Sequence, residues 1–120
     1  MNINIKATNI TMTDAISDYT EKRLETVHNF FKNDSTAQCD IELAKTTSHH
    51  KNGDIFKAEI HIVAKDANHY ASAEEIDLYQ AIDVVRDEIL RAVRSGKSRK
   101  ISLIRRGGAR IKEMIRGLRK

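Results

Sequence analysis

The stretch Phe56-Lys-Ala-Glu-Ile-His-Ile62 alternates strictly between apolar and polar side chains. Successive side chains of a β-strand point to opposite faces, so this alternation predicts a strand with one face in a core and the other in water. Segments 2–8, 39–45 and 69–73 are predicted as three further strands. The polar positions of the predicted sheet form a solvated face and include Asp40, Glu42, Lys57, Glu59 and His61.

Apolar residues recur at helical spacing over 16–31, which predicts one helix that begins after Thr11 or Thr13 and runs to about Phe31. The element that follows this helix is the strand over 39–45. The intervening polar cluster, residues 32–36, breaks the apolar pattern and separates the two elements.

A second helix is predicted to start near Glu74 or Glu75 and to continue through 78–93, where apolar residues again repeat at three- and four-residue steps. The carboxylates of Glu74 or Glu75 favour a helix start there, and Gly96 marks its end. The element order is therefore β-α-β-β-β-α. We expect an α+β fold in which one mostly antiparallel, four-stranded sheet carries both helices on one face.

The composition narrows the function classes. The 120 residues are 40% hydrophobic and 32% charged, as expected of one domain with a modest core and a charged surface. No apolar run approaches the roughly 20 residues that a membrane-spanning helix needs, and the N-terminus does not resemble a signal peptide. We therefore expect a cytoplasmic protein with no membrane partner.

The charge is unevenly distributed along the chain, although its net value is only +4. From Ser95 onward ten basic residues stand against one acid, Glu113, for a net charge of +9. Residues 1–94 carry eleven basic and sixteen acidic residues, for a net charge of −5. We predict a folded domain over 1–100 and a basic, partly helical tail over 101–120 that binds a polyanion. The alternative is a solvated tail that only aids solubility.

Metal binding and catalysis have little support in the sequence. The histidines lack the spacing of a helical zinc motif, and the alternation around Cys39 makes this residue a small core side chain rather than a nucleophile. We therefore expect no enzyme activity, no metal, no cofactor and no small-molecule substrate. One rival interpretation, a small metalloenzyme, would be built on His49, His50 and Asp54.

Basic residues instead recur along both predicted helices and beyond the second one. If the two helices pack side by side, these residues form a track suited to phosphate groups. Arginine predominates in the tail, and its planar guanidinium favours bidentate phosphate contacts with structured RNA. The track consists of Lys22, Arg23, Arg86, Arg91, Arg94, Lys97, Arg99 and Lys100, and the tail adds Arg105, Arg106 and Arg110.

A longer motif supports a ribosomal partner. The segment Tyr70-Ala-Ser-Ala-Glu-Glu-Ile-Asp-Leu-Tyr-Gln-Ala-Ile-Asp83 is similar to a pattern of the short ribosome hibernation factors, which include ribosome-associated inhibitors and sigma-54 modulation proteins. The resemblance covers about residues 1–100, including the opening strand and helix start. Asp77 and Tyr79 also have a purely structural interpretation at the helix start. The matching motif positions are Ser72, Asp77, Tyr79 and Asp83.

The resemblance implies a double-stranded-RNA-binding-like domain and a non-enzymatic factor. Such a factor binds 16S rRNA in the mRNA and tRNA channel of the small ribosomal subunit, inhibits translation and stabilises idle 70S ribosomes under stress. Its rRNA contacts, carried over by position, are Lys22, Arg23, Lys45, Arg91 and Lys97.

The chain also departs from the family pattern. Glu88 stands where a lysine is usual and Ala92 replaces a common glutamine, so Arg86 and Arg94 would have to compensate. The tail is too short for the dimerising domain of the long forms, and we hypothesise that it is a second RNA-binding arm. An RNA- or DNA-binding regulator unrelated to ribosomes is the alternative.

Overall fold

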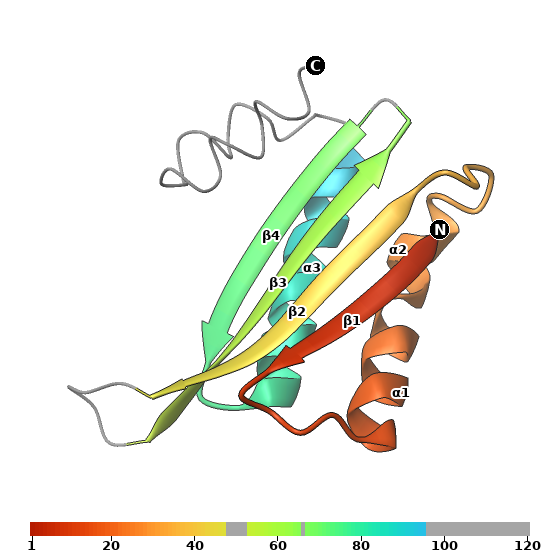
Figure 1. The fold of residues 1–120 in the computed structure, drawn as a ribbon. Coiled ribbons are helices and arrows are strands. Elements are labelled where there is room, and N and C mark those ends of the chain that lie inside the picture. Colours follow the sequence, from red (N-terminus) through yellow and green to blue (C-terminus); the bar gives the residue numbers. More distant parts are fainter. Residues whose placement is uncertain (48–52, 66, 96–120) are drawn as a thin grey trace, which may run out of the picture.

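The computed structural model describes residues 1–47, 53–65 and 67–95. These residues contain one four-stranded sheet in the order β1-β2-β3-β4, with three helical segments packed on one of its faces (Figure 1). The predicted α+β class and the single sheet with helices on one side are confirmed. The strands are β1 (Asn2–Thr8), β2 (Gln38–Thr47), β3 (Asp54–Ala64) and β4 (Ala67–Glu75).

The sheet is mixed, because β1 pairs with β2 in parallel while the other two pairings are antiparallel. Strands β1, β2 and β4 therefore run in one direction and β3 runs in the other. A parallel pair requires a crossover connection. Here the connection from β1 to β2 is made by α1 (Asp14–Arg23) and α2 (Glu25–Asn29), which lie over β1 and β2 (Figure 1).

The third helix, α3 (Leu78–Ser95), follows β4 and packs over β3 and β4. Since β1 and β4 run in the same direction, α1 and α3 start from the same end of the sheet and return side by side in parallel (Figure 1). Contacts between them keep this register: Tyr19 meets Asp83, and Thr26 of α2 meets Arg86.

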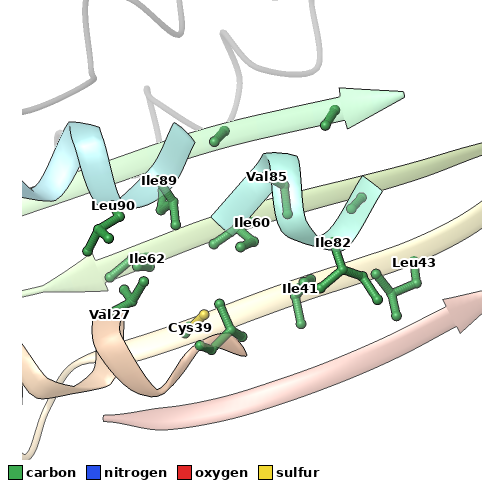
Figure 2. Packing of buried hydrophobic residues seen from close by; sticks show 14 of the residues in the cluster. Val27, Cys39, Ile41, Leu43, Ile60, Ile62, Ile82, Val85, Ile89 and Leu90 are labelled. Carbon is green, nitrogen blue, oxygen red and sulfur yellow. The ribbon is translucent and has the colours of Figure 1, made fainter. Parts of the chain in front are cut away.

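The core lies between this helical layer and the sheet. The apolar stripe of α3 is buried against branched side chains of β2 and β3 (Figure 2). The other face of the sheet carries the polar positions expected from the alternation, including Asp40, Glu42, Lys57, Glu59 and His61, and all of them are exposed or half-buried. The core residues with the largest completely buried side chains are Leu24, Ile41, Leu43, Ile60, Ile62, Ile82 and Ile89.

The predicted first helix is interrupted rather than continuous. It begins where expected, with the Thr13 hydroxyl accepting a hydrogen bond from the Ile16 N–H at 3.2 Å. At Leu24 the backbone leaves helical geometry (ψ −2°) and separates α1 from α2. One turn earlier, the buried Thr20 hydroxyl donates to the carbonyl oxygen of Ile16 at 2.8 Å, a contact that bends helices.

The predicted start of the second helix was wrong. Glu74 and Glu75 belong to β4, where they pair in register with Lys57 and Phe56. The helix begins at Leu78, because the Asp77 carboxylate accepts a hydrogen bond from the Gln80 N–H at 3.1 Å and so caps the first turn. Strands β2 and β4 also extend beyond the predicted segments, since ladder pairing continues past the alternating residues. Gly96, the expected helix end, lies outside the described residues.

The cap yields a stability prediction. Asp77→Ala leaves the N–H of Gln80 without its side-chain partner, so the free energy of unfolding should fall by about 1 kcal/mol. Chemical denaturation measures the change. The matched control is Glu74→Ala, which removes an exposed carboxylate from the end of β4 and should change stability by less than about 0.5 kcal/mol. A larger loss in the control than in Asp77→Ala would contradict a helix start capped by Asp77.

Cys39 yields a second prediction. Its side chain is completely buried in the core, and burial raises the pKa of the thiol to about 12. Because the thiolate is the reactive form, a thiol-specific reagent at pH 8 should label the folded protein very slowly and the urea-unfolded protein rapidly. Fast stoichiometric labelling of the folded chain would contradict the assignment of Cys39 to the core.

Candidate nucleic-acid interface

The structure describes part of the predicted RNA-binding set. Lys22 and Arg23 lie in the last turn of α1, Lys45 lies within β2 rather than after it, and Arg86, Arg91 and Arg94 lie on α3. Lys97, Arg99, Lys100, Arg105, Arg106 and Arg110 fall outside the described residues.

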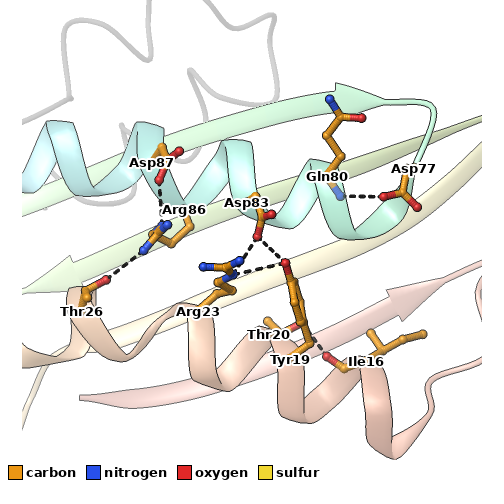
Figure 3. A network of polar contacts seen from close by, with 10 residues as sticks. All are labelled: Ile16, Tyr19, Thr20, Arg23, Thr26, Asp77, Gln80, Asp83, Arg86 and Asp87. Carbon is orange, nitrogen blue, oxygen red and sulfur yellow. Dashed lines mark hydrogen bonds and ion pairs between the residues drawn. The ribbon is translucent and has the colours of Figure 1, made fainter.

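Arg23 is held in a polar network between α1 and α3 (Figure 3). Its Nε lies 2.9 Å from Asp83 Oδ1 and donates to the Tyr19 hydroxyl at 3.2 Å. The Tyr19 hydroxyl in turn donates to the same carboxylate oxygen at 2.7 Å. The hydrogen bond with Tyr19 and the charge of Asp83 raise the pKa of the Arg23 guanidinium. Arg23 thus ties the two helices together as a charged group.

Arg86 also contacts a neighbouring helix, about one turn further along α3 than Asp83. Its Nε lies 2.8 Å from Asp87 Oδ1, and its Nη1 donates to the Thr26 hydroxyl of α2 at 3.5 Å (Figure 3). Only 19% of its side chain is exposed, which is the lowest fraction among the described basic residues that form ion pairs. Arg86 therefore joins α2 to α3 in this conformation and is poorly placed to contact a phosphate group.

Three exposed basic residues of the helical layer are available to a partner. Lys22 and Arg94 are exposed, and among the described residues neither has a carboxylate within 4 Å. The Arg91 side chain is 74% exposed and pairs only loosely with Glu88, at 3.6 Å. A shallow open groove on α3 is lined by Asp87, Leu90, Arg91 and Arg94.

Lys45 does not join this group. It pairs in register with Phe56, which pairs with Glu75 next to the start of α3. The 18 residues of α3 separate this end of the sheet from Arg94, a length of about 27 Å. Lys45 instead lies 3.7 Å from Asp54 on the neighbouring strand. The structure therefore separates Lys45 from Arg91 and Arg94.

The residues of the sequence motif have structural roles that can now be stated. Asp77 caps α3, and Asp83 holds Arg23 and Tyr19. Tyr79 packs edge-on against Tyr19, with ring centroids 4.8 Å apart. Ser72 lies on β4 opposite Glu59. The motif thus contributes largely to the joint between α1 and α3, which supports the structural interpretation of Asp77 and Tyr79.

The parallel packing of α1 and α3 produces a charge polarity that the sequence pattern alone did not reveal. Asp14 lies in the first turn of α1 and Asp77 caps α3, so the shared starting end is acidic. The last turn of α3 carries Arg94 at the opposite end, whereas Lys22 and Arg23 end the shorter α1 and lie near Asp83, in the first half of α3. Each helix is also favoured by this arrangement, because carboxylates suit helix N-termini and cations suit C-termini.

The open face of the sheet is poorly suited to phosphate groups. Its carboxylates accept hydrogen bonds from neutral neighbours, such as Thr8 to Glu42 at 2.6 Å and Tyr70 to Glu59 at 2.5 Å. Asp40 and Glu74 add further negative charge. A polyanion is therefore expected to meet the helical side of the molecule.

The structure gives no support to the rival interpretation of the chain as a small metalloenzyme. In the part of the chain that is described, no three His, Cys, Asp or Glu side chains gather as they would around a metal ion. Asp54 lies near Lys45, while His49 and His50 lie outside the described residues. No helix within the described ranges is both long and apolar enough to span a membrane.

Comparisons with known proteins point to one family. A family model described as "Sigma 54 modulation protein / S30EA ribosomal protein" matches residues 3–101. The ribosome hibernation promotion factor of Picosynechococcus sp. is 31% identical over 99 residues, which are 82% of this chain and 50% of the relative. The ribosome hibernation promoting factor of Azotobacter vinelandii is 27% identical over 101 residues, or 84% of this chain and 87% of that protein. The chain thus spans about half the length of the cyanobacterial relative.

Solved structures show the same fold. The N-terminal domain of Thermus thermophilus Protein Y superposes with a TM-score of 0.65 at 28% identity and covers 81% of this chain and all of that domain. A ribosomal subunit interface protein from Coxiella burnetii gives a TM-score of 0.64 at 16% identity and also covers 81% of this chain and all of the other. The likeness to the second protein concerns the fold alone.

Proposed function

The chain belongs to the sigma 54 modulation protein / S30EA ribosomal protein family, and from that premise we propose that it is a ribosome hibernation factor. It binds 16S rRNA in the mRNA and tRNA channel of the small subunit, inhibits translation and stabilises idle 70S ribosomes under stress. The names of its relatives support the ribosomal partner, and ribosome binding implies a cytoplasmic location.

One observation carries the choice of the binding surface. The exposed cations Arg91 and Arg94 lie near the C-terminal end of α3, and the exposed Lys22 lies on the same helical layer, next to Arg23, which contacts Asp83 in the first half of α3. The basic segment that begins at Lys97 follows directly from the end of α3 in the sequence. Exposed guanidinium groups without close acidic partners are the side chains best able to make bidentate contacts with phosphate oxygens.

The remaining predicted basic residues divide by environment. The contacts of Arg23 and Arg86 hold α1 and α2 against α3. These two arginines therefore position the binding surface rather than contact RNA. Lys45 would serve a separate contact at the other end of the sheet. This division narrows the direct contacts expected on the described residues to Lys22, Arg91 and Arg94.

Inhibition needs no chemical step in this proposal. A folded domain of this size excludes mRNA or tRNA from a channel simply by occupying it. Binding would also stabilise the idle ribosome, because a ligand that binds only the assembled ribosome shifts the equilibrium toward assembly. Neither a cofactor nor a small-molecule substrate is required.

Sedimentation of cell extracts tests the ribosomal partner. After starvation, the protein should move with the 30S and 70S fractions of a sucrose gradient and leave them when the salt concentration is raised. A protein that stays wholly at the top of the gradient under starvation would contradict the proposal. Recovery with free RNA or DNA in that case would favour a non-ribosomal regulator.

The binding surface gives a mutational prediction. Arg91→Gln or Arg94→Gln should each weaken binding to purified small subunits, because each removes one phosphate contact. Each should also reduce the slope of log affinity against log salt by roughly 0.7 to 0.9. Titrations at several salt concentrations measure both effects.

The matched control is Lys6→Gln, which removes one exposed positive charge from the opposite face of the sheet. It changes the net charge equally and should leave the slope unchanged. If Lys6→Gln lowered the slope while the two arginine variants did not, the assigned surface would be wrong.

The basic tail gives a separate prediction. A chain that ends at Lys100 should bind small subunits more weakly and with a flatter salt dependence, because the tail from 101 to 120 carries seven of the ten basic residues found after Ser95. Circular dichroism of the shortened chain controls for folding. Unchanged affinity and slope would show that the tail is not a second RNA-binding arm.

A further inference from the structure

An acidic side chain lies within the surface proposed to bind RNA. Asp87 lines the same shallow groove as Arg91 and Arg94, and its side chain is 58% exposed. Its Oδ1 lies 2.8 Å from Arg86 Nε, which makes an ion pair within α3, while Arg86 Nη1 donates to the Thr26 hydroxyl of α2 (Figure 3).

This position opposes the binding of phosphate groups in two ways. The negative charge of Asp87 repels a phosphate that enters the groove, and its contact with Arg86 keeps one guanidinium away from the surface. Helix stability alone gives little reason for a carboxylate here. Asp87 pairs with Arg86, an adjacent residue of the same helix, and neighbours of this kind do not face each other, so the pair contributes little to helix stability.

We infer that Asp87 is a specificity-determining residue, an inference that rests on the proposed function. The affinity for an unstructured polyanion depends on the summed positive charge of the protein surface, and Asp87 reduces that sum. A folded rRNA surface presents its phosphates at fixed positions, so it can contact Arg91 and Arg94 while avoiding the carboxylate. Asp87 therefore weakens non-specific binding more than specific binding, and specificity is the difference between the two.

The test compares two ligands with one conservative variant. Asp87→Asn removes the charge from an exposed side chain with little change in its size, so the fold should be retained. Binding to oligouridine represents an unstructured RNA, and binding to purified small subunits represents the specific partner. The control Asp18→Asn makes the same change in net charge. Asp18 is exposed and lies in the first half of α1, away from the groove.

Asp87→Asn should raise the affinity for oligouridine about threefold and steepen its salt slope by roughly 0.7, the value for one added contact with a single strand. The affinity for small subunits should change by less than about twofold, and Asp18→Asn should leave both affinities nearly unchanged. An equal increase for both ligands, or an effect on oligouridine no greater than that of Asp18→Asn, would overturn the inference.

The two arms also separate this inference from the proposed function. If the unmodified chain fails to bind small subunits, the proposed function is wrong, whereas the oligouridine arm still measures the repulsion by Asp87. If the unmodified chain binds small subunits but Asp87→Asn leaves oligouridine binding unchanged, only the inference about Asp87 is wrong.

Discussion

The parallel pairing of β1 with β2 is the constraint on which the rest of the structure depends. A parallel pair needs a crossover, and α1 and α2 supply it across one face of the sheet. Because β4 runs in the same direction as β1, α3 must start from the same end and return alongside α1. One shared core then buries both helices, and the other face of the sheet stays polar.

Topology also sorts the charges. Helices α1 and α3 each begin with a carboxylate and end with a cation, as their dipoles favour, and parallel packing places both carboxylates at one end of the helical layer. Beyond that end, Arg23 is bound to Asp83 and Arg86 is bound to Thr26, so both arginines link the helices. The net charge of the chain therefore says little about its binding surface, which depends on the cations left without a close acidic partner.

Much of the fold could be predicted because its signals are local. The alternation over 56–62 and the apolar stripe of α3 each reflect burial of one face, and both are confirmed. The helix start was misplaced because Glu74 and Glu75 favour a helix N-terminus by charge, whereas pairing with β3 decides their conformation. The partner of Arg23 could not be predicted, since Asp83 comes close only after α1 packs on α3.

A cryo-EM map of the chain bound to its own small ribosomal subunit tests the proposed binding surface most directly. We predict that the helical layer faces the rRNA, with density joining Lys22, Arg91 and Arg94 to phosphate groups. The open face of the sheet should point away from rRNA. A map in which that acidic face lies against rRNA, or in which the start of α3 makes the principal contact, would contradict the proposed surface.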